Sequence, residues 1–386
     1  MSLQELRPRR KTVVVIGGGI FGVSSANNLY RTLDPRFYEV KLVTISDHVY
    51  FLPASDRLAI TKDYRNVMIP IREVLDKYIP VIKGEVVHFD QKRVLFRSGF
   101  YQNFDVLIIA TGAKWASPIG STINFKDNHH NFFEKEGKNL KNAKHVVFIG
   151  GGFFSTELAG EVVHYYGRDI RTGKKKVTII HSSDKLLPNN GFFTDNLRDK
   201  ITNYLTSRGV TILKNCRGTQ LPFDPNVIIL NDNPETKLVA DLVYSGVGTN
   251  PSVPPNEIPD LCDRSGYIRV KPNFQAEAIS KGNIFAIGDV TDFSYHGIAK
   301  RDNWVNTLTH NVRQYLKYGN KYPLLHAQTF KMGDTIPCSV SLGPIQGFGQ
   351  IELPLIGKAI NLPSFIVIQT KSKKLLTNKA RHYYSR

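Results

Sequence analysis

Short apolar runs recur along the chain, and several are followed by glycine and then by a stretch with helical spacing. Runs of valine and isoleucine without alternating polar residues are typical of strands buried on both faces, as in a parallel sheet. Strands that alternate with helices in this way predict an α/β fold. The predicted strands are 13–16, 40–43, 106–109, 146–149, 177–180, 227–230, 242–244 and 284–287.

Two of these strands lead into nearly the same sequence. Val-Val-Val-Ile-Gly-Gly-Gly begins at Val13, and Val-Val-Phe-Ile-Gly-Gly-Gly begins at Val146. Two occurrences so far apart indicate two separate units rather than an array of short repeats. The chain has 386 residues, which is enough for two or three domains. We therefore predict two Rossmann-like dinucleotide-binding domains and a small C-terminal segment.

The first glycine loop, Gly17-Gly18-Gly19-Ile20-Phe21-Gly22, fits the pattern G-x-G-x-x-G between a predicted strand and a predicted helix. Gly17 would allow the tight turn, Gly19 would let the backbone approach a pyrophosphate, and Gly22 would let the helix pack close to the strand. Free N–H groups at the start of the helix, where the isoleucine and phenylalanine of the motif lie, would bind the phosphates. The alternative is a glycine-rich turn without a ligand.

In this type of unit, the second strand usually ends with an acidic residue that binds the adenosine ribose. Here that place has Thr44-Ile45-Ser46, and Asp47 follows just beyond. A threonine hydroxyl can hydrogen-bond a ribose hydroxyl, so Thr44 is the candidate for this contact.

The second glycine loop, Gly150-Gly151-Gly152-Phe153-Phe154-Ser155, repeats the plan with serine in the place of the third glycine. Serine is small enough to keep the helix near the strand, so Gly150 and Gly152 are expected to bind a second dinucleotide. Glu157 and Glu161 follow on one face of the helix. Either they form a solvated acidic face, or Glu157 lies beside a nicotinamide ribose.

The second strand of this unit ends at His181-Ser182-Ser183-Asp184-Lys185. An acid directly at the strand end would favour NADH and repel a 2′-phosphate. His181, Ser182 and Lys185 do not repel such a phosphate, so NADH and NADPH both remain open. His181 is predicted to contact the cofactor.

The composition adds a strong positive charge, because 51 Lys+Arg against 33 Asp+Glu give a formal net charge of +18. Such a field attracts anions, including dinucleotides, acidic membranes and nucleic acid. The alternative is that the charge only aids solubility. The basic residues cluster within 7–11, 174–176 and 371–386.

Only three cysteines occur, Cys216, Cys262 and Cys338, and none are close in sequence. This excludes a CxxC dithiol, argues against a disulfide framework or a cysteine zinc site, and suits a reducing compartment.

No apolar run approaches the roughly 18 residues needed to cross a bilayer. The first apolar run begins at Thr12, so we expect no long cleavable signal. Position 2 is serine and not glycine, so we expect no N-myristoylation. We expect a cytoplasmic or mitochondrial protein that is not secreted.

Two further segments complete a pattern. Residues 106–112, Val-Leu-Ile-Ile-Ala-Thr-Gly, are an apolar strand that ends in Ala-Thr-Gly. Residues 283–289, Asn-Ile-Phe-Ala-Ile-Gly-Asp, end in Ala-Ile-Gly-Asp. Both look like the flavin-binding strands of two-dinucleotide oxidoreductases. With these motifs, the chain resembles the apoptosis-inducing-factor-like family. Within it, the chain resembles the short branch that contains fungal homologues and the ferroptosis-suppressor type of NAD(P)H:quinone oxidoreductase. The resemblance covers about residues 12 to 374 and includes segments 50–57, 246–251, 340–344 and 347–350.

This resemblance implies FAD in the first unit, NADH or NADPH in the second, and electron transfer to a quinone or another acceptor. Thr111, Gly112 and Asp289 match the flavin-binding motifs, and the Asp289 carboxylate would accept hydrogen bonds from the ribityl chain. Arg57 and Gly248 lie in shared segments and are further cofactor-binding candidates. The expected domains are 1–121 with 251–325 for FAD, 122–250 for NAD(P)H, and a C-terminal segment 326–386 that covers the flavin or an acceptor site.

Hydride transfer from nicotinamide to flavin needs no side-chain nucleophile, because the cofactors supply the chemistry. Besides Glu157, Lys300 is a candidate catalytic residue that would stabilise the reduced flavin or bind the acceptor. The alternative for Lys300 and Arg301 is a solvated basic pair.

A rival function is that of a pro-death effector that binds DNA without sequence preference. The chain has no base-reading motif, so such binding would depend on phosphate contacts and on salt.

Residues 353–368 are largely apolar but are interrupted by Pro354, Gly357 and Pro363, and lysines follow at 371, 373 and 374. Apolar residues next to basic ones suit a segment that lies on an anionic membrane surface. The alternative is a strand and a helix that pack on the FAD domain and end in a solvated basic tail.

Overall fold

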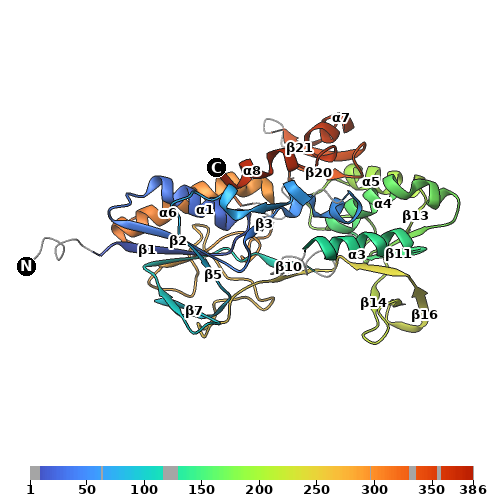
Figure 1. Cartoon of the computed structure of the whole chain (residues 1–386). Coiled ribbons are helices and arrows are strands. Elements are labelled where there is room, and N and C mark those ends of the chain that lie inside the picture. Colours follow the sequence, from blue (N-terminus) through green and yellow to red (C-terminus); the bar gives the residue numbers. More distant parts are fainter. Residues whose placement is uncertain are drawn as a thin grey trace, which may run out of the picture.

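The computed structural model describes residues 9–61, 64–115, 129–295, 297–329, 336–353 and 358–385. Two α/β units lie side by side, and the C-terminal segment runs across both of them (Figure 1). Each unit is built on its own parallel sheet. The predicted α/β class with two Rossmann-like units is confirmed.

The first sheet has the strand order β19–β9–β1–β2–β5, and all its strands are parallel. Val13, Val14 and Val15 in the middle strand have no exposed surface, which explains a run of valines without polar alternation. Helices α1 and α6 pack against each other over one face of this sheet (Figure 1). The elements are β1 (Lys11–Ile16), β2 (Tyr38–Thr44), β5 (Val81–Lys83), β9 (Val106–Ile109), β19 (Ile284–Ala286), α1 (Ile20–Thr32) and α6 (Arg301–Tyr318).

The second sheet has the strand order β13–β12–β11–β17 and is also parallel. Its core is separate from that of the first unit and is formed by the strands together with α4 and α5. The elements are β11 (His145–Ile149), β12 (Lys176–Ile180), β13 (Val210–Leu213), β17 (Leu242–Ser245), α4 (Phe153–Arg171) and α5 (Asp195–Ser207).

One predicted parallel strand was wrong. Residues Val227–Leu230 form β15, the middle strand of an antiparallel sheet with β14 (Gly218–Gln220) and β16 (Asn233–Val239). Only Ile228 of this run is fully buried, and β16 is almost entirely exposed. The apolar run therefore packs one side against a small core cluster and is not buried on both faces, as a central parallel strand would be.

The chain passes between the units twice, and the two passages pair with each other as antiparallel strands β10 (Ala113–Trp115) and β18 (Thr249–Pro251). Helix α3 (His129–Asn142) follows the first passage. Phe133 of α3 belongs to the core of the first unit, and Leu140 belongs to the core of the second. The remaining short elements are β3 (His48–Tyr50), β4 (Met68–Pro70), β6 (Val86–Phe89), β7 (Arg93–Phe96), β8 (Tyr101–Asn103), α2 (Leu58–Thr61), and the 3₁₀ helices η1 (Leu52–Arg57), η2 (Tyr64–Asn66), η3 (Ile71–Glu73) and η5 (Ile298–Lys300).

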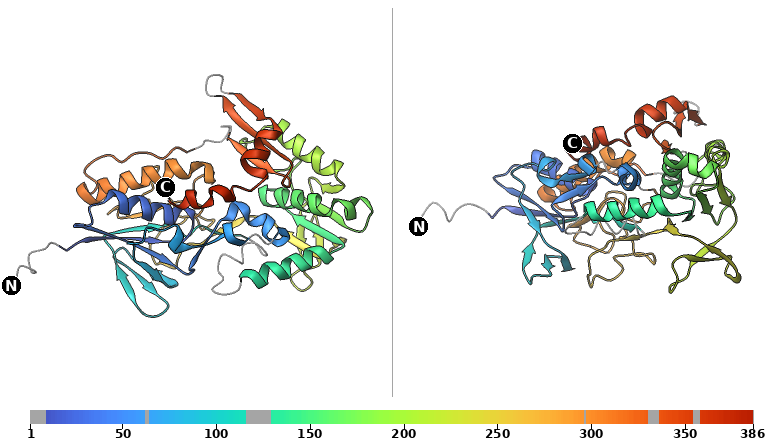
Figure 2. Two further views of the ribbon diagram at one scale, coloured as in Figure 1. Left: turned by 45° about the horizontal axis from the view of Figure 1, so that its top comes forward. Right: turned by 45° about the vertical axis from the view of Figure 1, so that its right-hand side comes forward.

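The C-terminal segment packs on both units (Figure 2). Strand β20 packs against α4, where a Cβ on Gly160 would lie 2.5 Å from Leu342 Cα. The last helix packs on α1, where the Asn27 amide donates to Tyr384 O at 2.9 Å. The elements are β20 (Cys338–Ser341), β21 (Gly347–Leu353), β22 (Lys358–Leu362), α7 (Ser364–Val367), η6 (Ile368–Ser372), η7 (Thr377–Lys379) and α8 (Ala380–Ser385).

The apolar run 353–368 thus belongs to a folded hairpin and a short helix, apart from Pro354 to Gly357, which lie outside the described residues. Among the described helices, none combines the length and the apolar composition that a bilayer crossing requires.

Candidate functional site

The first glycine loop follows β1 and forms the N-terminus of α1. Gly17 has a φ of +121°, and a Cβ there would lie 2.2 Å from Ala110 O. A Cβ on Gly22 would lie 2.0 Å from Gly17 O, so only glycine allows the helix to lie this close to the strand. A Cβ on Gly19, by contrast, would meet nothing within 4 Å. The fold itself leaves space free at Gly19, as a bound pyrophosphate requires.

Helix α1 offers unused hydrogen-bond donors at this space. Its first intrahelical bond runs from Val23 N to Gly19 O, so the N–H groups of Ile20, Phe21 and Gly22 have no acceptor within the helix. The Phe21 ring points into the core and packs against Trp304, with ring centroids 5.8 Å apart. Ile20 and Phe21 can therefore contact a phosphate through their backbones.

Three motifs of the first unit meet at one edge of its sheet, because β1, β9 and β19 are parallel neighbours. Gly17 follows β1, Thr111 and Gly112 follow β9, and half-buried Asp289 follows β19. The Thr111 hydroxyl is buried and has no hydrogen-bond partner among the described residues. Gly112 has a φ of +67° and open space at its Cβ position. Open space and an unpartnered hydroxyl fit an extended ligand such as FAD at this edge.

Thr44 ends β2 directly beneath the loop, and a Cβ on Gly18 would lie 2.4 Å from the Thr44 Oγ1. The Thr44 hydroxyl is already engaged with the Ser46 backbone, since Oγ1 accepts from Ser46 N at 3.2 Å. Asp47 pairs on the surface with Lys83 at 2.5 Å. A ribose contact by Thr44 stays a prediction.

Lys300 and Arg301 are buried, with exposed fractions of 4% and 3%, which excludes the alternative of a solvated basic pair. Arg301 Nε donates to Ser24 Oγ of α1 at 3.1 Å. Its Nη1 pairs with Asp302, and its Nη2 has no hydrogen-bond partner among the described residues. Both cations thus lie inside the first unit, close to the helix that follows its glycine loop.

The second glycine loop reproduces the geometry of the first. Gly152 caps α4 with φ −72° and ψ −176°, and Gly19 caps α1 with φ −82° and ψ −175°. A Cβ on Gly152 would again meet nothing within 4 Å. Gly150 has a φ of +91°, and a Cβ there would lie 2.9 Å from Gly246 O. The same cradle for a pyrophosphate therefore occurs twice in the chain.

Ser155 can replace the third glycine of this loop because the residue facing its side chain, Gly246, has no side chain. A Cβ on Gly246 would lie 2.3 Å from the Ser155 Oγ, so Gly246 provides the space that the serine uses. Gly248, just beyond, has a φ of +73° and nothing within 4 Å of its Cβ position. It remains a candidate for cofactor contact.

His181 lies against the second loop as a neutral ring with a defined tautomer. Its Nδ1 accepts from Gly151 N at 3.0 Å, and its Nε2 is 2.9 Å from Lys185 O. An amide N–H can only donate, so Nδ1 is unprotonated and Nε2 carries the hydrogen. Burial lowers the pKa of His181, which agrees with a neutral ring. His181 holds the glycine loop in place, and direct contact with a cofactor stays a prediction.

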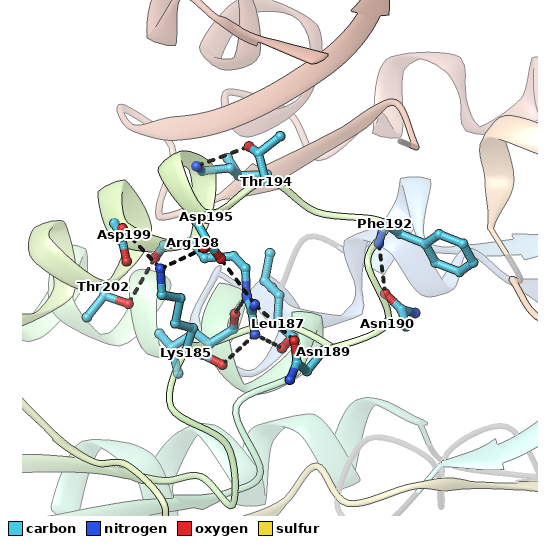
Figure 3. A network of polar contacts seen from close by, with 12 residues as sticks. Lys185, Leu187, Asn189, Asn190, Phe192, Thr194, Asp195, Arg198, Asp199 and Thr202 are labelled. Carbon is cyan, nitrogen blue, oxygen red and sulfur yellow. Dashed lines mark hydrogen bonds and ion pairs between the residues drawn. The ribbon is translucent and has the colours of Figure 1, made fainter. Parts of the chain in front are cut away.

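The segment after β12 is fixed by Arg198 and Lys185 (Figure 3). Arg198 is buried and donates to the carbonyl oxygens of residues 185, 186 and 187. Lys185 pairs with Asp195 at 3.2 Å and Asp199 at 3.4 Å. The Lys185 charge is therefore already balanced by carboxylates, and the choice between NADH and NADPH stays open.

Glu157 and Glu161 do not form a solvated acidic face, because both are buried and paired. Glu157 Oε1 accepts from Ser341 N at 2.8 Å and pairs with Lys371 Nζ at 2.5 Å. Glu161 forms a two-pronged pair with Arg57, with N–O distances of 2.9 and 2.6 Å. The predicted cofactor-binding residue Arg57 thus uses its guanidinium to join the two units. It also donates to Ser372 O and Lys373 O of the C-terminal segment.

Replacing Arg57 with methionine is expected to lower the free energy of unfolding by about 3–5 kcal/mol, because Glu161 would be left as an unpaired buried charge. The Glu161 carboxylate is 1% exposed, so solvent cannot replace the guanidinium. Urea unfolding at equal FAD content measures the loss. The double variant Arg57→Met/Glu161→Met is expected to regain most of it, and a double variant as unstable as the single one would contradict this account.

Some lysines of the basic clusters predicted from the sequence are buried or paired inside the fold. Lys175 is buried, and its Nζ donates to Leu140 O at 2.8 Å at the end of α3. Lys371 is paired with Glu157, as described above. The predicted alternative of a wholly solvated basic tail is therefore wrong for Lys371, and DNA binding by the remaining surface charge stays a prediction.

Comparison with known proteins matches residues 11–314 to the family model described as pyridine nucleotide-disulphide oxidoreductase. The chain is 49% identical over 369 residues to apoptosis-inducing factor 1 of Saccharomyces cerevisiae, covering 96% of this chain and 97% of the relative. The chain belongs to the pyridine nucleotide-disulphide oxidoreductase family. The predicted resemblance to apoptosis-inducing-factor-like proteins is confirmed.

Two further proteins are similar to this chain. The type II NADH:quinone oxidoreductase of Staphylococcus saprophyticus is 26% identical over 313 residues, covering 74% of this chain and 75% of the relative. The structure of the sulfide:quinone oxidoreductase of Aquifex aeolicus has the same fold, with a TM-score of 0.74 and 19% identity, covering 97% of this chain and 92% of that chain. Family membership makes this chain an oxidoreductase that uses FAD and NADH or NADPH.

The disulphide in the family's name has no counterpart in this chain. Cys216, Cys262 and Cys338 are all free. Burial raises the pKa of all three thiols, and that of Cys338 to about 12, so none is a reactive thiolate near neutral pH. Electrons therefore cannot leave the flavin through a cysteine pair of the protein.

Three residues near Glu157 and Glu161 were not indicated by the sequence: Asp56, Ser341, and Lys371 as the partner of Glu157. Asp56 lies between Ser55 and Arg57 in the chain, so nothing in its immediate sequence indicates a buried acid. No local pattern indicates that Lys371 would reach Glu157, because 214 residues separate them.

Proposed function

We propose that this protein is an FAD-dependent NAD(P)H:quinone oxidoreductase. The main supporting observation is the pair of matching glycine loops, each with free space at the middle glycine. The similarity to a type II NADH:quinone oxidoreductase supports a quinone as acceptor. Three free, unreactive cysteines favour an external acceptor over a protein disulfide. We also propose the division into 1–121 with 251–325, 122–250 and 326–386 as the FAD, NAD(P)H and C-terminal parts.

In this mechanism, bound FAD would accept a hydride from the nicotinamide and pass electrons to the quinone. The chain binds and orients these groups. The N-termini of α1 and α4 would hold the two pyrophosphates through backbone N–H groups. Ser341 and Lys371 hold the Glu157 carboxylate in one position, about one helical turn after the second loop. Glu157 and the buried Lys300 are the proposed catalytic residues.

Anaerobic titration of the purified holoprotein with NADH and then NADPH tests the proposal. We expect one equivalent of either nucleotide to bleach the flavin absorbance, and a panel of quinones to restore it faster than oxygen does. The nucleotide that bleaches at the lower concentration identifies the preferred donor. Bleaching without reoxidation by any quinone would exclude a quinone acceptor, and no bleaching would exclude the NAD(P)H step.

We further propose that the C-terminal segment contacts an anionic membrane surface, where a lipid-soluble quinone would be found. Ile345, Ile360 and Phe365 are 65%, 43% and 67% exposed, and Lys373 and Lys374 nearby are exposed as well. Apolar side chains beside lysines fit a membrane interface. We propose a cytoplasmic or mitochondrial location, because a quinone acceptor would be dissolved in a membrane there.

The membrane contact predicts that the holoprotein co-sediments with anionic vesicles but not with neutral ones, and less so in added salt. Lys373→Gln/Lys374→Gln is expected to weaken binding, since each basic residue near the surface contributes about 1 kcal/mol. Phe365→Ser is expected to weaken it as well, because it removes apolar area that would be buried in the membrane. Lys371 stays unchanged in both variants because it pairs with Glu157. Equal sedimentation of the wild type and both variants would exclude the contact.

A further inference from the structure

Five ionisable side chains from three parts of the chain meet at the junction of the two units. Asp56 and Arg57 come from η1, Glu157 and Glu161 from α4, and Lys371 from the C-terminal segment. All are largely buried: Asp56 is 7% exposed, and the side chains of Arg57, Glu161, Lys371 and Glu157 are 12%, 1%, 16% and 8% exposed. We call this group the junction cluster.

Asp56 is the member of the junction cluster without a partner. The other four form two ion pairs, Arg57 with Glu161 and Lys371 with Glu157. Within the described parts of the chain, no hydrogen bond or ion pair reaches the Asp56 side chain, which keeps 7% exposure. Fully ionised, three carboxylates against two cations would leave one uncompensated negative charge in a buried site, which is costly.

The surroundings of Asp56 favour its neutral form. Burial, and next the Glu157 carboxylate, raise the pKa of Asp56 well above its ordinary value, and Lys371 and Arg57 oppose this only in part. Two nearby groups add no compensating charge. Burial and Arg57 lower the pKa of His164, and burial raises the pKa of Cys338 to about 12, so both are neutral near pH 7.

A pocket lies beside the junction cluster, and one member of the cluster, Arg57, lines it. A pocket of about 260 Å³ is lined by Ala54, Arg57 and Leu58, the neighbours of Asp56, together with Lys373 and Lys374. Glu157 lies in the first two turns of α4, directly after Gly150–Gly152. Asp56 itself keeps 7% exposure, so its carboxyl group can exchange protons with water. Through Glu157, the cluster includes the helix that begins at the second glycine loop.

We propose that Asp56 is kept as a neutral carboxylic acid and supplies the proton that a quinone needs when it is reduced. This rests on the proposed function. NAD(P)H, a quinone and one proton give NAD(P)⁺ and a hydroquinone. The hydride brings two electrons and one hydrogen nucleus, and the second proton comes from the O–H bond of Asp56. The resulting carboxylate regains a proton from water, so the protein returns to its starting state.

The test compares the wild-type holoprotein with Asp56→Asn, which keeps the shape and neutrality of the acid but has no acidic proton. We expect unchanged reduction of FAD by NAD(P)H and unchanged electron transfer to ferricyanide, which takes up electrons without protons. Reoxidation by a quinone is expected to fall about 100-fold, the lower range for loss of a general acid. Small protonated buffers should restore part of this rate. Asp260→Asn, an exposed acid outside the cluster, is the matched control.

Infrared difference spectra give a readout that does not depend on activity. The wild type at pH 7 should show the carbonyl band of a protonated carboxylic acid that is missing in Asp56→Asn. Equal quinone rates in the two proteins, or no such band, would overturn the proposal for Asp56. A wild type that reduces ferricyanide but no quinone would instead overturn the proposed function. If Asp56→Asn fails to fold, Asp56→Glu is the second variant. It keeps an acidic proton, so the quinone rate should remain and the carbonyl band should shift in position. An unshifted band would show that the protonated acid is not residue 56.

Discussion

Replacing Gly19 with valine is expected to give a folded protein that purifies without FAD. The backbone of Gly19 has φ −82° and ψ −175°, which valine adopts without strain, and a Cβ there meets no atom within 4 Å. The side chain would instead fill the space proposed for the pyrophosphate and keep it from the N–H groups of α1. Losing two charge-assisted hydrogen bonds of about 1.5–3 kcal/mol each weakens FAD binding by about 100-fold or more.

Flavin absorbance per mole of purified protein measures this effect, and circular dichroism reports the fold. Gly22→Val is the informative contrast, because its Cβ would lie 2.0 Å from a backbone oxygen and should disrupt the fold itself. Full FAD content in a folded Gly19→Val protein would mean that the first loop does not bind the flavin nucleotide.

The matching change in the second loop, Gly152→Val, is expected to leave FAD bound and to raise the Michaelis constant for NAD(P)H about 100-fold or more, for the same hydrogen-bond reason. Gly152 has φ −72° and ψ −176° and open space at its Cβ position, so the substitution is tolerated by the fold. Stopped-flow reduction of the bound flavin at increasing nucleotide concentrations measures this.

The two variants serve as controls for each other, because the loops have the same geometry and differ only in the unit to which they belong. Loss of FAD in Gly152→Val together with its retention in Gly19→Val would show that the two units are exchanged in the assignment. Unchanged kinetics in Gly152→Val would remove the second loop as the nicotinamide site.

Charged residues near these loops were harder to interpret from the sequence than the loops themselves. Glu157 and Glu161 four residues apart, or Lys300 next to Arg301, are equally compatible with a solvated face and with a buried site. Burial decided between these alternatives in all four cases. Burial depends on which distant segment covers a helix, and neither spacing nor composition contains that information.

The sequence by itself determined the α/β class, four of the five strands of the first parallel sheet, three of the four strands of the second, and the positions of both glycine loops. These features depend on local rules: strands buried on both faces need continuous apolar runs, and a strand that turns directly into a helix needs glycine. Only the tertiary structure decided that Val227–Leu230 pairs in an antiparallel sheet, that the tail returns to α1, and that Lys371 reaches Glu157. Those contacts join residues far apart in the chain, so they form only when the whole fold brings the segments together, and they leave no periodic signal in the sequence.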